Sequence, residues 1–147
     1  MNIKTDSRGQ KYIKIKIPKR VGKFTDWCDV DHLMFLSIGM LFEEYVVGEI
    51  GGLDSLMENL ECAKKQLKNK ELHEWDYAYY EHDVPLQEEI LKLYKMWLAF
   101  PKYVKKLEKE FLMEDEGNLW HYYEELIHQL EDQFMRRVID IRLTLWT

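Results

Sequence analysis

Apolar and polar residues recur at helical spacing over most of the chain, which predicts a mainly α-helical fold. The first helix is expected to run from Asp29, whose carboxylate can cap its free amides, to about Ile50, before two glycines. Apolar residues surround the first half of this helix, so we expect other helices to enclose it at the centre of a bundle. Gly39 lowers the helix propensity of this stretch and indicates a close crossing with another helix.

About five helices are expected in total. Ser55 and Glu58 form a capping-box pattern at the start of the second helix. A third helix is expected to begin at Pro85, because proline suits the first helical turn, and to break or restart at Pro101. These helices carry apolar residues at one-face spacing, so each can bury one side against the first helix.

The segments between the expected helices carry loop signals. Residues 74–83, EWDYAYYEHD, precede the expected start of the third helix and are interpreted as a connecting segment. Residues 114–118, EDEGN, form the clearest loop in the sequence. The last helix is expected from about residue 119 to residue 145, which is long enough to span the domain.

The N-terminal region shows a different period. Isoleucines alternate with lysines over residues 12–17, which is typical of a half-buried edge strand, and Pro18 ends the pattern. The rest of the chain offers no second convincing strand. We therefore expect this strand to pair with residues 1–8 or with the same arm of a second copy, and dimerisation through the arm is a hypothesis.

Charge divides the chain at about residue 24. Eight basic residues against one acidic residue give residues 1–24 a charge of +7, and the remaining 13 basic and 26 acidic residues give the rest a charge of −13. We divide the chain into a basic arm at residues 1–24 and a single α-helical domain at residues 25–147. A basic arm can neutralise phosphates, but the acidic body would repel a polyanion, so nucleic acid is not the expected partner.

Composition places the chain in a broad class. With 147 residues, 46% of them apolar, it can bury the core of one domain. Its apolar stretches are too short to cross a bilayer, and its N-terminus lacks the features of a secretory signal. Cys28 and Cys62 form no disulfide pattern, so we expect two buried thiols and a cytoplasmic location.

Three motifs carry a resemblance to a known group. They are W-C-D-x-D-H at residues 27–32, E-I-x-x-L-Y-x-x-W at residues 89–97 and R-V-I-x-I-R-L-x-L-W-T at residues 137–147. Over about residues 25–147 the chain resembles small, uncharacterised tailed-bacteriophage proteins. Those proteins more often carry two adjacent tryptophans followed by Arg-Pro, where this chain has Lys-Met-Trp and then Ala-Phe-Pro. The resemblance implies a host-directed or replication-period phage role in the host cytoplasm, without an assigned activity.

Three function classes remain open. The first is a non-catalytic counter-defence protein that sequesters a nucleotide signal between subunits, with basic residues on the phosphates and aromatic residues stacked on the base. The ligand-binding candidates for this function are Arg8, Lys19, Arg20, Lys23, Trp75, Tyr79, Tyr80 and Arg137. The second is an acidic protein inhibitor of a host nucleic-acid-binding enzyme. The third is a metal-dependent enzyme of nucleotide metabolism, although the common catalytic motifs are missing and catalysis is not the favoured interpretation.

Arg137 and the aromatic candidates each have a structural alternative. Arg137 lies on the apolar side of the last helix, where an unpaired charge is costly. We expect it to meet a carboxylate, with Asp31 and Glu44 as the candidates, or an anionic ligand. The aromatic residues of the 74–83 segment have the alternative of folding back onto the helices as packed rings.

A metal site is the weakest of the chemical hypotheses. Asp29 and His32, and Glu125 and His128, have the one-turn spacing used in di-iron bundles. However, Glu125 and His128 share a stripe with His121 and Asp132 that lies opposite the apolar face, and should point to water. A hydrogen bond from His32 to Asp29 or Asp31 is the favoured interpretation. The Glu-x-x-Glu pattern at residues 58–61 resembles half of the magnesium pattern of all-α nucleotide pyrophosphatases, but its second half is missing, so no metal or cofactor is expected.

Overall fold

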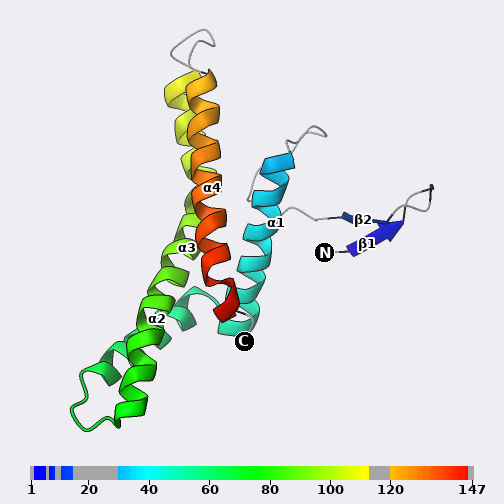
Figure 1. Cartoon of the computed structure of the whole chain (residues 1–147). Coiled ribbons are helices and arrows are strands. Elements are labelled where there is room, and N and C mark those ends of the chain that lie inside the picture. The colour runs from blue at the N-terminus through cyan, green and yellow to red at the C-terminus, as the bar shows by residue number, and fades with distance from the viewer. Residues whose placement is uncertain (1, 6, 9–10, 15–29, 113–119, 146–147) are drawn as a thin grey trace.

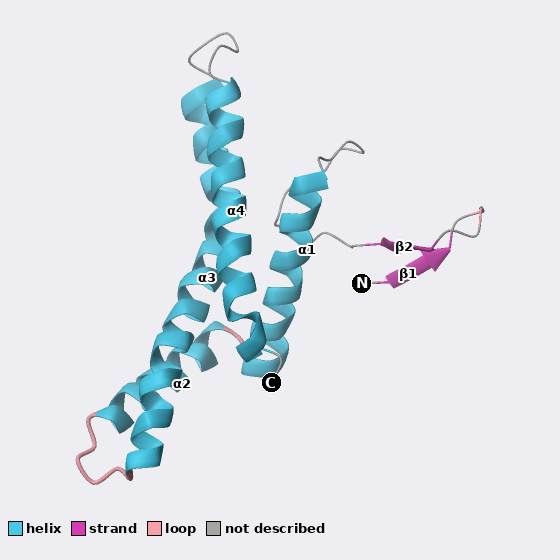
Figure 2. Cartoon of the chain, in the orientation of Figure 1, coloured by secondary structure: helices cyan, strands magenta, loops and turns pink. Residues whose placement is uncertain are grey.

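A computed structural model of the chain describes residues 2–5, 7–8, 11–14, 30–112 and 120–145. Helices dominate this part of the chain, as Figure 2 shows, and the prediction of a mainly α-helical fold is confirmed. The elements are β1 (Asn2–Thr5), β2 (Lys11–Lys14), α1 (Val30–Tyr45), the π-helical segment η2 (Val46–Ile50), α2 (Leu53–Leu67), α3 (Glu74–Leu112) and α4 (Trp120–Leu145). Among the described helices, none combines the length and the apolar character needed to cross a membrane.

The two strands form a short antiparallel hairpin. Its register places Ile3 opposite Ile13 and Lys4 opposite Tyr12. The strand expected at residues 12–17 reaches beyond β2, and residues 15–17 lie outside the described part of the chain. Two strands alone are marginally stable in water, so a hairpin of this size gains from packing against another surface.

α3 is one continuous helix of 39 residues, with Pro85 and Pro101 inside it. The prediction of about five helices is therefore wrong, as are the predicted break at Pro101, the start at Pro85 and the connecting segment at residues 74–83. Packing explains the difference, because buried side chains lie on both sides of each proline: Val84 and Ile90 around the first, and Phe100 and Leu107 around the second. Tertiary contacts thus hold the helix together where local propensity opposes it.

The other helices are arranged along α3 (Figure 1). α2 runs antiparallel to the first half of α3, and α4 runs antiparallel to its second half. α1 lies against α4 and meets α3 where their side chains cross. At about 1.5 Å per residue, α3 extends over roughly 58 Å and is the longest described element.

The core has a larger and a smaller part. The larger cluster joins α1, α3 and α4 with the start of α2. At its centre the Phe134 ring contacts those of Phe35, Phe42 and Trp97. The smaller cluster joins α2 to the first half of α3 through Leu60, Ala63 and Val84. The one-face apolar patterns predicted for these helices supply the buried residues of both clusters.

The close helix crossing predicted at Gly39 is confirmed. A Cβ atom at this position would lie 2.1 Å from Cζ3 of Trp97, so the indole ring fills the space that a side chain would need. Trp97 is 2% exposed, and its Nε1 donates a hydrogen bond to Glu43 Oε2 at 2.9 Å. Gly39 therefore lets α3 approach α1.

The predicted enclosure of α1 on all sides is wrong. One side of the helix buries Phe35, Leu36 and Phe42, but the other side leaves Leu33 38% and Met34 53% exposed. α4 and α3 pack against the first side only. Within the described part of one chain, the neighbouring helices therefore cover only part of the apolar surface of α1.

Smaller differences concern α2 and the last connection. α2 begins at Leu53, with Gly52 at its N-cap, and Ser55 lies inside the helix with its Oγ 3.4 Å from the Gly51 carbonyl oxygen, so the capping box is wrong. Partial burial of Leu53 against the larger cluster explains the earlier start. Cys62 is exposed rather than buried. The predicted loop at residues 114–118 and Cys28 lie outside the described residues. α4 confirms the last helix.

Candidate binding surface at one end of the molecule

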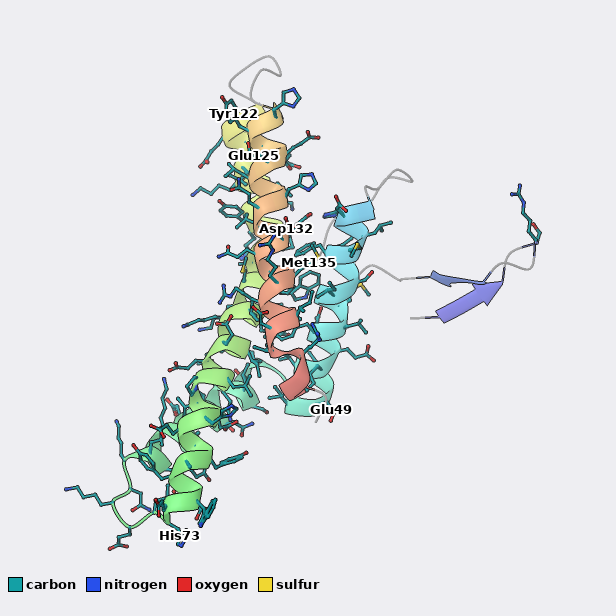
Figure 3. The ribbon with its side chains drawn as sticks, in the orientation of Figure 1. Glu49, His73, Tyr122, Glu125, Asp132 and Met135 are labelled. Carbon is teal, nitrogen blue, oxygen red and sulfur yellow. The ribbon has the colours of Figure 1, made fainter. Side chains whose placement is uncertain are left out.

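The first two turns of α3 carry an unusual density of exposed rings. Trp75 is 80% exposed, Tyr77 45% and Tyr79 63%. We call these three residues the aromatic end of α3. His73, labelled in Figure 3, precedes the helix and marks this extremity of the molecule, far from Tyr122 at the other end. The aromatic end therefore lies at this extremity of the molecule, beside the turn that joins α2 to α3.

The candidate rings lie in different environments, because they project from different sides of α3. Trp75 and Tyr79 are four residues apart and so lie on the same side of α3. Tyr80 projects elsewhere and packs against the smaller core cluster, so it contributes to structure. The Tyr79 and Tyr80 rings meet nearly edge to face, with centroids 5.3 Å apart. This contact orients Tyr79 while leaving most of its ring accessible.

A hollow of about 380 Å³ lies beside the aromatic end, at the turn between α2 and α3. It is lined by Leu67, Lys68, Asn69, Lys70, Leu72, Glu74 and Tyr77. Lys68 and Lys70 are exposed and place two positive charges next to the Tyr77 ring. The sequence interpretation missed these lysines because their place at the end of a helix is explained by the helix dipole. Their nearness to the aromatic run in the sequence was the available signal.

Acidic side chains surround the same rings. Glu74 and Asp76 occupy the first turn of α3 and Glu81 follows one turn later, all three exposed. Lys64, one turn before the end of α2, is paired with Glu88 at 2.7 Å. That hydrogen bond lowers the pKa of Glu88. The aromatic end therefore presents its rings among exposed charges of both signs, with Glu74, Asp76 and Glu81 as well as Lys68 and Lys70.

Arg137 is engaged by a carboxylate, but by neither of the two that were expected. Its Nε and its Nη2 donate hydrogen bonds to the two carboxylate oxygens of Glu89, at 2.6 Å and 2.9 Å. The partner is therefore Glu89 of α3 rather than Asp31 or Glu44. Hydrogen bonding to Arg137 lowers the pKa of Glu89, and the same contact raises the pKa of Arg137. This two-pronged contact fixes α4 against α3.

The structure does not bring Arg137 together with the aromatic end. Glu89 lies 14 residues beyond Trp75 on the same helix, which corresponds to about 21 Å. Arg8 is exposed in the turn between β1 and β2, whereas Lys19, Arg20 and Lys23 lie outside the described residues. Of the eight candidates, Trp75, Tyr79 and Tyr80 lie together, and Arg137 belongs to a separate structural contact.

Sequence reasoning also missed a buried carboxylate. Glu131 is 2% exposed, and its Oε1 is hydrogen-bonded to Nδ1 of His32 across the α1–α4 contact. The expected partners of His32 were Asp29, which lies outside the described residues, and Asp31, so this expectation is corrected to Glu131. Glu131 precedes Phe134 by three positions and therefore shares the buried face of α4. An acidic residue at a core position was the available signal.

The described residues give no support to the hypothesis of a metal site. Within them, no group of three or more His, Cys, Asp or Glu side chains is close enough to hold an ion. Glu125 and His128 are exposed, as the stripe pattern predicts, and Figure 3 shows Glu125 and Asp132 projecting from α4. Asp29 is outside the described residues.

The described side chains thus place accessible aromatic rings, two lysines and several carboxylates at one end of the molecule. Such a surface can bind and orient a partner through ring contacts and charge. Comparisons with protein-family models, with curated proteins and with solved structures find no match to this chain.

Proposed function

We propose that this chain is a non-catalytic binding protein of bacteriophage type that interferes with a host process by docking onto a host protein. The observation that carries the proposal is the 80% exposure of Trp75 at the start of a long helix. Exposed tryptophan and tyrosine side chains supply much of the binding energy in protein interfaces, because they bury large areas at a small entropic cost. A rigid helix presents them without the cost of ordering a loop.

Charge indicates the kind of partner. The acids around the aromatic end and the charge of −13 over residues 25–147 favour a basic surface, such as that of a host nucleic-acid-binding enzyme. In this arrangement the rings would enter apolar pockets while the carboxylates steer the approach. The proposal corresponds to an acidic inhibitor that occupies a nucleic-acid site.

A direct test compares two tyrosines of equal exposure. Tyr79 is 63% exposed at the aromatic end and Tyr122 is 62% exposed on α4 at the other end of the molecule. Wild-type protein is expected to retain a basic host protein in stoichiometric amount. Replacing a central aromatic anchor commonly costs 2 kcal/mol or more, so Trp75→Ala and Tyr79→Ala should each weaken binding by about 30-fold or more. Tyr122→Ala should bind like wild type, and equal losses in all three variants would refute the proposed surface.

A second candidate function is sequestration of a nucleotide, and the hollow beside Tyr77 favours it. A base could stack on an aromatic ring while Lys68 and Lys70 meet the phosphates. Because Arg137 is hydrogen-bonded to Glu89, a bound nucleotide would have to be held by other cations. Titration calorimetry with cyclic and ADP-ribose-type nucleotides tests it: Lys68→Ala should abolish heat that wild type produces. The absence of heat for wild type would leave protein docking as the function.

A further inference from the structure

We propose that a notch between α3 and α4, together with a row of lysines on α3, is a docking site for an acidic peptide segment of a partner protein. The notch has a volume of about 160 Å³, and its described lining comes from α3 and α4: Met96, Ala99, Phe100, Tyr103 and Leu130. Ala99 lies 24 residues beyond Trp75 on α3, which corresponds to about 36 Å. The site is therefore separate from the aromatic end and adds a second binding surface.

The notch is suited to one large apolar side chain. Apart from the Tyr103 hydroxyl, its described walls are apolar, so a polar group buried there would lack hydrogen-bond partners. An apolar cavity of about 150 Å³ in another protein holds one benzene molecule, so the notch can hold a phenylalanine ring or a leucine side chain. Phe100 is 7% exposed, and its ring centroid lies 4.5 Å from that of Phe35 in the core. Part of the wall is therefore packed before anything binds.

Four exposed lysines, which we call the lysine row, lie beside the notch: Lys92, Lys95, Lys102 and Lys106. Ala99 is seven residues from the first and from the last of them, so the row and Ala99 share one side of α3. The helix dipole favours cations in the last turn of a helix, and the row lies before the last turn of α3. The dipole therefore does not account for these lysines.

The lysine row concentrates positive charge in an acidic body. Residues 92–109 contain six lysines and one glutamate, a charge of +5, whereas residues 25–147 as a whole have a charge of −13. Among the described residues, Lys95 and Lys102 have no carboxylate within ion-pair distance. These two cations are therefore available to a partner.

The other two lysines of the row have acidic neighbours. Lys106 Nζ lies 3.8 Å from Glu110 Oε1 in an exposed pair, which contributes little to stability and can be exchanged for a partner's carboxylate. Lys92 contributes to the lowered pKa of Glu88 and of Glu89, whose carboxylates are hydrogen-bonded to other side chains. An incoming carboxylate therefore meets the two middle lysines of the row first.

α4 adds no charge on its side of the notch. Leu126 and Gln133 lie four residues before and three residues after Leu130, so they share its side of the helix, and both are uncharged. Asp132 lies nearly opposite, and Figure 3 shows it projecting from α4 with Glu125. At physiological salt, interactions between exposed charges fade beyond about 8 Å. A segment at the notch is therefore attracted by the lysine row despite the acidic remainder of the body.

These features favour an acidic peptide over other occupants. A nucleic acid would satisfy the lysines, but the polar edge of a base gains nothing from an apolar notch. The N-terminal arm has a charge of +7 and is repelled by the lysine row. An amphipathic helix with glutamates around one phenylalanine or leucine supplies both contacts, with the apolar side chain in the notch and the carboxylates against the lysines.

The test uses synthetic, fluorescein-labelled peptides of about twelve residues, roughly three turns of helix, with glutamates around one central phenylalanine or leucine. Fluorescence anisotropy at physiological salt should show saturable binding to the whole chain. A peptide of the same charge with alanine at the centre should bind at least about tenfold more weakly, because no large apolar side chain is buried. In nuclear magnetic resonance spectra of methionine methyl groups, the phenylalanine peptide should shift Met96 and leave the 44% exposed Met57 of α2 unchanged.

Matched variants separate the notch from the lysine row. Ala99→Met fills the notch and should weaken binding by about tenfold, whereas Ala78→Met, at another exposed alanine of α3, should bind like wild type. Lys102→Glu should weaken binding by about fivefold, and Lys65→Glu, which changes the net charge equally on α2, should not. Circular dichroism should show equal helix content in all variants. Trp75→Ala should bind the peptides like wild type, which distinguishes this site from the docking surface proposed above.

Three outcomes overturn the proposal. The first is that no peptide binds saturably, or that the phenylalanine and alanine peptides bind equally. The second is that a single-stranded oligonucleotide of equal charge binds more tightly than the peptides and is unaffected by Ala99→Met, because the lysine row would then serve phosphates. The third is that wild type alone forms an oligomer that Ala99→Met dissociates, since a second copy would then occupy the notch.

Discussion

Glu131 makes the clearest residue-scale prediction, because its carboxylate is buried and paired. Glu131→Ala removes the acceptor for His32 and leaves that side chain without this bond between α1 and α4. We expect the free energy of unfolding to fall by about 1–3 kcal/mol. Urea denaturation measures the change. Glu125→Ala is the control, since Glu125 is exposed on the same helix and its loss should stay within about 0.5 kcal/mol.

Gly39 tests the helix crossing at the level of one methyl group. Alanine usually stabilises a helix relative to glycine, yet here its Cβ would overlap the Trp97 ring. Overpacking of this kind costs about 1–3 kcal/mol, so Gly39→Ala should lower the melting temperature. Thermal unfolding followed by circular dichroism gives the answer. A higher melting temperature would mean that Trp97 can leave the crossing at little cost.

At the scale of elements, Pro85 tests the continuity of α3. The residue is exposed and lies inside the helix, where proline removes a backbone hydrogen bond. Pro85→Ala should therefore raise the free energy of unfolding, by up to about 3 kcal/mol, without changing the helix content. If a helix began at Pro85, the proline would suit its position and the substitution would give no gain. Urea denaturation and circular dichroism distinguish the two results.

The contact between Glu89 and Arg137 makes the attachment of α4 to α3 sensitive to acid. The pKa of Glu89 is lowered in the folded protein, so the carboxylate stabilises the fold at pH values above its ordinary pKa of 4.5. That contribution disappears as the pH falls through the lowered pKa. Both side chains are partly exposed, which limits the contribution to about 1 kcal/mol.

The matching measurement compares wild type with Glu89→Gln over a range of pH. At pH 7 wild type should be more stable, and below pH 4.5 the difference should shrink toward zero. Glu125→Gln, on an exposed face, should show no such dependence. If the difference in stability between the two proteins stays constant with pH, the contact is stabilised by packing rather than by charge.

The elements were predictable where periodicity decides them. The buried faces of α2 and α4 follow the apolar spacing, and Gly39 indicated the crossing of α1 with α3. Pro85 and Pro101 led to wrong helix boundaries, because the preference of proline for the first helical turn reflects only the local sequence. Packing on both sides of each proline holds α3 together. The partner of His32 escaped prediction because Glu131 lies on another helix. The partner of Arg137 escaped prediction because the expected carboxylates are on α1, whereas Glu89 is on α3. Periodicity tells which side of a helix is buried, not which helix covers it.

On the scale of the whole molecule, the stabilising contacts are unevenly distributed. Of the described side chains between residues 101 and 110, Leu107 alone is buried, and none is buried between residues 121 and 130. Tyr123 ties this end together by donating a hydrogen bond to Glu108 at 3.3 Å, and burial raises the pKa of its phenol to about 12. The large core cluster lies nearer the middle of α3.

This distribution predicts a gradient of local stability. Backbone amides near Leu107 and Leu126 should exchange with solvent through local opening, at a lower free energy than amides near Trp97 and Phe134. Hydrogen exchange followed by mass spectrometry measures the difference directly. Uniform protection along α3 would show that the helix opens only as a whole.

The contact between α1 and α4 has a consequence for how the protein is made. His32 and Glu131 are 99 residues apart, so the most apolar helix leaves the ribosome long before the helix that covers it. At about 5–20 residues per second, the delay is roughly 5–20 seconds. During that time α3 is the only one of the two helices packed against α1 that can reach it. Nascent chains therefore expose the α4-facing side of α1 until the C-terminal helix arrives, and a chain truncated before α4 lacks Phe134 and Val138 of the core.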